Sequence, residues 1–564
     1  MIPYFYRSMH NNRLTFLFVI ILVVFSLWAM KALFHPGFYT SHDGWHQVAR
    51  LYHYDQAIRA GQFPPRYSFN LLYGFGYPLF TFSYHLPWLF AEPFILSGFS
   101  IFTAIKLVFI VGFVGSGVVM FFWLKNTFNL LSGFVGAFLY LWAPYRFSNI
   151  FVRAAIGEAT SFVFMPLFFY GLCTTKLEKN SIPLVIGALG LTGIILSHTM
   201  MLYILVVPVI VYCSLKLYVQ KRNRFQYLVY WFKTIVLGLL LSSFYFLPAV
   251  YYKNITIFDS VQKLFFQQQF VTLRQLIYMP WGYSAAFTGV GEMSLQLGIT
   301  QWLIFVVTLI ILGWGIMKKK KLELKTEKQI ISITFFASFL LSIFIMNPLA
   351  KPIWKQISTS ATIDFPWRFL ALSVFSCAVM GSFVVYFLPK KYRYLVITII
   401  IGIGLYVNRN HLKVNQYTDV PLSLYIASEK TTNTFDEYLP KYTQTGEVNN
   451  ENRKPFTVDS EKATIKDYTQ KVNEINFTFD AAYVTQLKVN AIYFPGMHLF
   501  VNNKEQTIKY QDTGFPQLEL PIGQGTVQLL IKESKIGKIG NLISLVTIFY
   551  ILLLLGKMRY GKKL

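Results

Sequence analysis

Apolar runs of bilayer-spanning length recur along most of the chain, with short polar loops between them. A transmembrane helix needs roughly 20 apolar residues. Runs of about that length lie at Leu14–Phe34 and near 102–124, 128–143, 159–175, 182–197, 200–218, 230–250, 299–317, 330–346, 366–388, 394–408 and 539–556. The pattern predicts an α-helical polytopic membrane protein with about 12 transmembrane helices.

Residues 79–97 are also apolar, but Pro87, Glu92 and Pro93 interrupt them. If this segment does not cross the bilayer, every Lys- and Arg-rich loop lies on the side of the N-terminus, as the positive-inside rule requires. These loops contain Lys125, Lys176, Lys221, Lys318, Lys390 and Lys557. We therefore predict a broken helix on the outer face and place both termini in the cytoplasm.

A polar region interrupts the apolar pattern near the C-terminus. Between Arg409 and Glu533 the chain carries 15 acidic and 13 basic residues, and "INFTFDAAYVTQLKVNAIYF" partly alternates between apolar and polar positions. Such alternation, with glycines at the turns, predicts β-strands. The expected domains are a transmembrane domain at 1–408 with outer loops at 35–100 and 251–298, a small extracytoplasmic β-sandwich-like domain at 409–537, and a last transmembrane helix with a basic cytoplasmic tail at 538–564.

Composition supports a membrane protein. Of the 564 residues, 54% are hydrophobic and only 13% are charged, which excludes a disordered chain and an ordinary soluble domain. The net charge of +26 comes from cation clusters between apolar runs, so we interpret it as a topology signal. It does not indicate a nucleic-acid surface, and the lipid bilayer is the expected partner.

Acidic residues are scarce outside the polar region: only ten of the 25 lie in the rest of the chain. A carboxylate close to hydrocarbon is costly, so such residues at the outer ends of helices are functional candidates. Those on or near the outer side are Asp43, Asp55, Glu92, Glu158, Asp259, Glu292 and Asp364. A structural ion pair or a helix cap is the alternative for each of them.

Asp43 lies in "SHDGWHQ", just after the first apolar run. A partly buried carboxylate at this position is suited to accept a proton from an acceptor hydroxyl, which would make Asp43 catalytic. The alternative is a helix N-cap, because Asp43 directly precedes a helical pattern. His42 and His46 flank Asp43 and suggest substrate binding or a metal site, but a fourth ligand is not evident.

Arg153 and Glu158 lie in "VRAAIGE" at the outer end of a span. Their spacing of five does not stack them on one helix face, so the turn between them decides whether they pair. The Arg153 guanidinium is suited to bind a lipid-linked phosphate through two oxygens. An interfacial arginine whose side chain snorkels to water is the alternative.

Asp364 and Arg368 lie in "TIDFPWRFL" at the start of another span. Asp364 before Pro366 is typical of a helix start. Arg368 is one turn inside the membrane, where a cation needs an anion. His198, at a turn in "LSHTMM", is a candidate donor to the same anion or, alternatively, a structural histidine.

Several motifs in the same order resemble one bacterial family. They are "SHDGWHQVARLYHYDQAIRAGQFPPRY", "YGFGYPLF", "YHLP", "VRAAIGE", "FPWRFL", "DEYLP" and "IYFPGMHLFVNN". Together they resemble the YfhO-like membrane proteins, and more closely the 6-pyruvoyl-tetrahydropterin-synthase-related membrane proteins. These families in turn resemble the GT-C glycosyltransferases, which use polyprenyl-phosphate sugars as donors.

The resemblance implies a GT-C-like fold in the bacterial plasma membrane. It implies that Asp43 is the active-site acid of the first outer loop, that Glu158 at the second acidic position is also catalytic, and that residues 79–97 form in-plane helices. Arg368 matches only as a motif residue. No DxD pair is present, so no cofactor is assigned and dependence on a divalent cation stays open.

The expected function is transfer of a sugar from a polyprenyl-phosphate donor to an envelope glycan or teichoic-acid-like acceptor. In this mechanism Asp43 takes the proton of the acceptor hydroxyl, and Arg153, Arg368 and His198 stabilise the leaving phosphate. The alternative is a non-catalytic flippase, transporter or assembly scaffold for lipid-linked saccharides, since transporters share broken helices and intramembrane charges.

Overall fold

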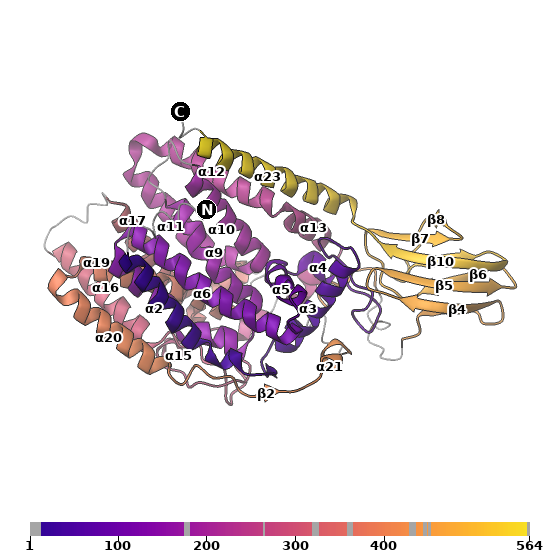
Figure 1. Cartoon of the computed structure of the whole chain (residues 1–564), viewed down its shortest axis with the longest axis horizontal. Helices are drawn as coiled ribbons and strands as arrows, with labels where there is room; N and C mark the ends of the chain where they lie inside the picture. The colour runs from indigo at the N-terminus through magenta and orange to yellow at the C-terminus, as the bar shows by residue number, and fades with distance from the viewer. Residues whose placement is uncertain are drawn as a thin grey trace.

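The computed structural model describes residues 13–173, 181–262, 265–317, 326–357, 365–427, 436–443, 448 and 453–560. The helices form an elongated bundle, and the strands of the polar region project from one end of it (Figure 1). The longer helices are α2 (Arg13–Ala29), α3 (Gly44–Arg59), α5 (Leu86–Leu96), α6 (Ile101–Thr127), α7 (Leu130–Leu141), α9 (Ile156–Leu172), α10 (Ile182–Ser197), α11 (Met200–Val219), α12 (Arg224–Leu241), α13 (Ser243–Lys253), α16 (Ile299–Met317), α17 (Glu327–Met346), α19 (Leu370–Phe387), α20 (Lys390–Asn408) and α23 (Lys535–Tyr560).

Short helical elements occupy the connections. They are η1 (Lys31–Phe34), α4 (Leu79–Phe82), α8 (Pro144–Phe147), the single π-turn η2 (Ser148–Val152), η3 (Lys221–Asn223), α14 (Phe258–Gln262), η4 (Phe265–Gln268), α15 (Leu273–Ile277), η5 (Pro348–Ala350), α18 (Lys351–Ile357), η6 (Pro366–Phe369) and α21 (Leu422–Ala427).

The bundle has the surface of a membrane protein. In the described ranges, five helices are long and apolar enough to cross a bilayer, and the α12–α13 pair would make a sixth span. Leu545 and Phe549 on α23 are both 63% exposed. An apolar surface of this kind is stable against lipid and not in water. The chain is therefore a mostly helical membrane protein, and the count of about 12 spans stays a prediction.

α2 and α6 run antiparallel, and this places the first long loop at one end of the bundle. Lys125 Nζ donates to Thr15 Oγ1 at 2.9 Å, and Lys106 Nζ donates to the carbonyl of Gly37 at 2.8 Å. The chain thus leaves the bundle after α2 and re-enters it at α6 at the same end. α5 lies within this loop, and its 11 residues extend only about 16 Å, too short to cross a bilayer.

The continuous span predicted near 230–250 is broken in the structure. α12 and α13 meet at a bend of 79°. The hydroxyls of Ser242 and Ser243 donate to the carbonyls of Gly238 and Leu239, each at 3.0 Å. Side-chain hydroxyls that compete for helical carbonyls favour such bends.

Two antiparallel sheets form the polar region. The strands are β3 (Phe456–Val458), β4 (Ala463–Gln470), β5 (Glu474–Ala481), β6 (Thr485–Val489), β7 (Met497–Val501), β8 (Lys504–Gln506), β9 (Gln517–Leu520) and β10 (Gly523–Ile531). One sheet has the order β4-β5-β10-β7-β8 and the other β3-β6-β9. Phe477 and Leu529 from the first sheet share a core with Leu487 and Leu520 from the second. The strands predicted here are therefore confirmed.

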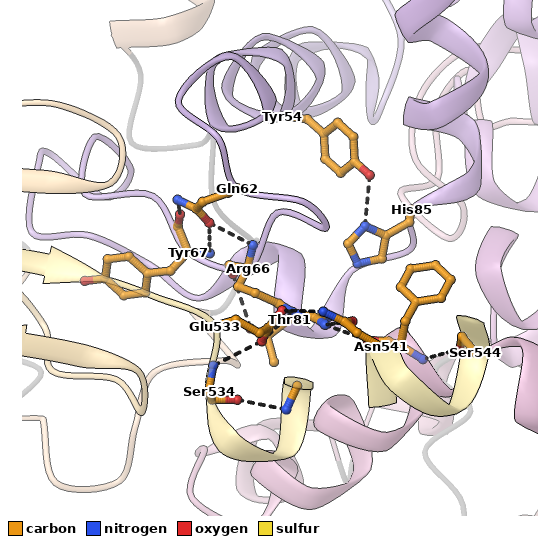
Figure 2. A network of polar contacts seen from close by, with 12 residues as sticks. Tyr54, Gln62, Arg66, Tyr67, Thr81, His85, Glu533, Ser534, Asn541 and Ser544 are labelled. Carbon is orange, nitrogen blue, oxygen red and sulfur yellow. Dashed lines mark hydrogen bonds and ion pairs between the residues drawn. The ribbon is translucent and has the colours of Figure 1, made fainter. Parts of the chain in front are cut away.

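A buried network anchors this region to the bundle (Figure 2). Pro248 in α13 has no N–H to donate to the carbonyl of Phe244, four residues earlier. Arg66 Nη2 from the first loop donates to that carbonyl at 2.6 Å, and Arg66 Nε donates to Glu533 Oε2 at 3.1 Å. Asn541 Nδ2 donates to the same carboxylate at 3.2 Å. The end of β10, the start of α23, α13 and the first loop are thus held together.

Candidate functional site

A cavity of about 600 Å³ is lined in part by residues of α3 and α13. These two helices lie at the end of the bundle that carries the β-sheets (Figure 1). α9 and α11 begin at this cavity, and α10 and α13 end at it. Its charged and polar lining includes Asp43, His46, Gln47, Arg50, Tyr84, Arg153, Glu158, His198, Lys253, Arg368 and Glu437. Six parts of the chain that are distant in the sequence therefore supply one site.

Glu158 is the centre of a buried ion cluster in this cavity. It is fully buried in the first turn of α9. Arg153 Nη1 donates to Glu158 Oε2 at 2.8 Å, and the Tyr145 hydroxyl donates to Oε1. Arg368 Nη1 lies 3.9 Å from the same Oε2. A carboxylate without water needs such partners, so Glu158 holds two guanidinium groups at the cavity wall.

The turn before α9 explains how residues five apart come to pair. η2 is a π-turn, and Ala154 after it has φ +53°, a conformation that L-residues seldom adopt. Gly157 is packed so closely that a Cβ atom there would lie 2.5 Å from the carbonyl oxygen of Ser197 and 2.7 Å from the Tyr84 ring. A backbone turned in this way brings Arg153 back toward Glu158.

Asp43 is attached to the same turn through its backbone. Its N–H donates to the carbonyl of Arg153 at 2.8 Å. Asp43 precedes α3, but within the described part of the chain its side chain makes no capping hydrogen bond. Burial lowers the pKa of the Arg153 guanidinium, whereas Glu158, Tyr145 and Asp43 raise it more, so the net pKa lies above its ordinary value. Asp43 thus lines the cavity close enough to act on Arg153.

His198 contacts Arg368, with 3.1 Å between Nε2 and Arg368 Nη1. Burial, and then the Arg368 guanidinium, lower the pKa of His198 to about 3, so the ring is neutral. A neutral Nε2 beside an arginine is the acceptor, which assigns the ring proton to Nδ1. The ring also stacks on Tyr84 at a centroid distance of 6.0 Å. His198 therefore orients Arg368.

The remaining predicted residues are placed differently. His46 lines the cavity, whereas His42 is absent from the lining and its Nε2 lies 2.9 Å from the carbonyl of Tyr283. Asp364 lies outside the described residues. No three His, Cys, Asp or Glu side chains gather as a metal site in the ranges that the structure covers.

Two cavity residues, Arg50 and Glu437, and Tyr145 behind Glu158 were not found by sequence reasoning. Tyr145 and Arg50 are far in the sequence from the groups they face, and a lone tyrosine or arginine carries no pattern. Glu437 lies in "DEYLP", which was noted only as part of the family resemblance. The sequence signal available for Glu437 was a carboxylate next to an aromatic residue in an otherwise polar segment.

One wall of the cavity is apolar and continues onto the helix surface. Tyr203 and Val206 of α11 are 43% and 47% exposed, and Val250 of α13 is 54% exposed. These side chains face the surroundings of the bundle, where a membrane protein meets lipid. The cavity therefore joins buried charges to a surface suited to hydrocarbon.

Comparisons with known proteins agree with a membrane protein of one family. Residues 81–416 match the family described as the 6-pyruvoyl-tetrahydropterin synthase related domain, a membrane protein. An uncharacterized protein of Lactococcus lactis subsp. cremoris is 26% identical over 253 residues, which are 42% of this chain and 40% of that protein. The chain thus spans well under half of that relative.

A solved structure, the arabinofuranosyltransferase AftD from Mycobacteria, is similar with a TM-score of 0.43 and 12% identity, over 72% of this chain and 27% of that one. This similarity is too weak to assign the fold. The family match covers more than half of the chain and confirms the resemblance noted in the motifs. The chain belongs to the 6-pyruvoyl-tetrahydropterin synthase related family of membrane proteins.

Proposed function

We propose that the cavity is the active site of a membrane glycosyltransferase of GT-C type. The enzyme transfers a sugar from a polyprenyl-phosphate donor to an envelope glycan or polymer. One observation carries this proposal: a single cavity joins two buried guanidinium groups, at Arg153 and Arg368, to an apolar wall at the lipid-facing surface. A lipid-linked phosphate has these two requirements, a cationic site for the phosphate and a hydrocarbon path for its chain.

The cavity also supplies a base for the acceptor. Asp43 takes the proton of the acceptor hydroxyl while the hydroxyl oxygen forms a bond to the anomeric carbon of the sugar. The bond between that carbon and the phosphate oxygen breaks, and the lipid phosphate leaves with the electron pair. Arg153 and Arg368 stabilise the departing charge. Glu158 keeps both arginines in place and is a positioning residue in this mechanism.

The membrane orientation follows from charge. Lys125 is in the last turn of α6, Lys221 lies between α11 and α12, and Lys390 begins α20, all at helix ends remote from the cavity. By the positive-inside rule these ends face the cytoplasm. The cavity and the sheets then face the outside of the plasma membrane, and both termini lie in the cytoplasm.

Asp43→Asn tests the proposal, because it keeps the size of the side chain and removes the base. We expect loss of sugar incorporation into envelope glycans in cells that carry the variant, with the protein present at the normal level. Asp459→Asn, on an exposed turn of the β region, is the matched control. A lipid-saccharide carrier or scaffold has no need of a base, so full incorporation with Asp43→Asn would contradict the transferase.

A further inference from the structure

Two short helices, α15 and α18, lie at the ends of α16 and α17 on the cavity side of the bundle. Ser148 Oγ of η2 donates to the carbonyl of Ser294 at 3.1 Å, which places the start of α16 near the turn before α9. Val271 N–H donates to the carbonyl of Met346 at 2.8 Å, so the chain entering α15 meets the end of α17. α18 follows α17 after the single turn η5.

Each of these two helices has one side fixed against the bundle. The carbonyl of Leu276 in α15 accepts a hydrogen bond from Trp302 Nε1 of α16 at 3.0 Å. In α18, Trp354 is fully buried, and its Nε1 donates to the carbonyl of Ile345 at 2.7 Å. Phe270, just before α15, contacts the Trp354 ring at a centroid distance of 6.2 Å. The two helices are therefore neighbours, and their remaining sides form one surface, here called the platform (residues 272–278 and 348–357).

The platform exposes apolar side chains next to its buried ones. Leu273 and Ile277 are four apart on one flank of α15, and both are about half exposed. Leu349 in η5 is 77% exposed, and Ile353 in α18 is also exposed. At the start of α16, the exposed Ile299 continues the same apolar character onto a membrane helix. Exposed apolar side chains that continue a lipid-facing surface are stable against lipid.

The platform is also cationic. Arg274 of α15 and Lys351 of α18 are exposed, whereas residues 260–291 and 347–363 contain no Asp or Glu. In the orientation proposed above, these cations face the outside, where the positive-inside rule makes Lys and Arg less frequent. Tyr278, next to α15, is an exposed aromatic residue of the kind enriched at membrane interfaces. Exposed cations beside exposed apolar side chains are typical of helices that lie in a headgroup layer.

Trp367 connects the platform to the cationic part of the cavity. Its Nε1 donates to Gln269 Oε1, a few residues before α15, at 3.0 Å. The Arg153 Cζ atom lies 4.7 Å from the centroid of the Trp367 ring, and Arg368 follows Trp367 directly in the chain. The depth of the platform in the bilayer therefore sets the depth of both cavity arginines.

We propose that the platform lies in the headgroup layer of the leaflet on the cavity side and binds anionic phospholipid there. Arg274 and Lys351 contact the lipid phosphates, and the exposed apolar side chains enter the adjoining acyl region. In the orientation proposed above, this is the outer leaflet. The inference concerns the seat of the protein in the bilayer and does not depend on the reaction in the cavity.

The test uses the full-length protein in liposomes, with a fluorescent probe attached to a cysteine introduced by Leu349→Cys or Ile277→Cys. Phospholipids with bromine near the headgroup end of the acyl chain quench such a probe on contact. We expect both probes to be quenched. Brominated phosphatidylglycerol should reach half-quenching at a mole fraction at least about fivefold lower than brominated phosphatidylcholine, the effect of one cation at an anionic lipid surface. The labelled wild type, whose Cys173, Cys213 and Cys377 are buried or half-buried, gives the background signal.

Charge-matched variants separate lipid selectivity from simple contact. Arg274→Gln combined with Lys351→Gln should remove the preference for phosphatidylglycerol while quenching persists. Lys462→Gln combined with Lys471→Gln removes the same charge from exposed positions of the β region and should keep the preference. A probe at Tyr483→Cys, on an exposed residue of the β region, should not be quenched. Unquenched platform probes, equal quenching by the two lipids, or a preference retained without Arg274 and Lys351 would each overturn the proposal.

Discussion

The backbone N–H of Asp43 donates to the carbonyl of Arg153 at 2.8 Å, so the proposed base and the proposed phosphate ligand share one structural support. The two residues come from the first long loop and from the turn before α9. Any change that displaces this turn is therefore expected to move both groups together. Variants around Glu158 are therefore expected to affect both Asp43 and Arg153.

Glu158→Gln is expected to destabilise the protein by about 3–5 kcal/mol, because it leaves the buried Arg153 and Arg368 without their carboxylate. The measurement is thermal unfolding of the purified protein in detergent. Glu505→Gln, at an exposed position, should stay within about 0.5 kcal/mol of the wild type. Equal unfolding temperatures for the two variants would show that Glu158 does not hold the arginines.

Arg368→Lys is expected to lower the rate of sugar incorporation at least about tenfold with normal protein abundance, since an ammonium group cannot replace the planar fork. The lysine retains the positive charge that Glu158 requires, so the unfolding temperature changes less than in Glu158→Gln. Incorporation is followed with a labelled sugar in whole cells. An unaltered rate would remove Arg368 from the phosphate site.

Gly157→Ala is expected to cost about 1–3 kcal/mol of unfolding free energy, because the added methyl group overlaps the carbonyl of Ser197 and the Tyr84 ring. Gly112→Ala in α6 is the matched control. A Cβ atom at Gly112 meets nothing within 4 Å among the described atoms, so the same substitution is neutral or slightly stabilising there. Similar losses for both variants would contradict the close packing at Gly157.

Glu92 in α5 makes stability depend on pH. Burial, followed by the charge of Asp55, raises the pKa of Glu92 from 4.5 to about 7. The folded protein therefore binds this proton more tightly than the unfolded chain, and stability falls as the pH rises between about 4.5 and 7. Melting temperatures at pH 5 and pH 8 should differ more in the wild type than in Glu92→Gln. A pH slope identical in both would contradict the shift.

Much of the helical architecture is predictable from the sequence, because apolar length and basic loops are local signals. Arg153, Glu158, His198 and Arg368 each lie at the end of an apolar run, and the structure brings them to one cavity. Their pairing was not predictable, since it depends on the π-turn η2 and on the left-handed conformation of Ala154. Neither feature has a sequence signature.

The bend between α12 and α13 and the position of Glu437 at the cavity also could not be predicted from the sequence. A run of apolar residues near 230–250 predicts a straight span. Serine residues alone do not predict a bend, because they are also common in helices that are straight. Glu437 reaches the cavity only because backbone pairing with residues 255–257 carries it there. Contacts between segments so distant along the chain are a property of the tertiary structure.

The polar region contacts the first long loop and the cavity before its two sheets begin. β2 (Tyr417–Thr418) pairs with β1 (Phe38–Tyr39), a few residues ahead of Asp43, and Glu437 and Tyr438 then line the cavity. We therefore expect that removal of the whole polar region would not leave a functional helical bundle. An exchange between relatives that is limited to the sheets at 456–531 would keep β2 and residues 436–443 native. Such an exchange leaves the cavity wall intact.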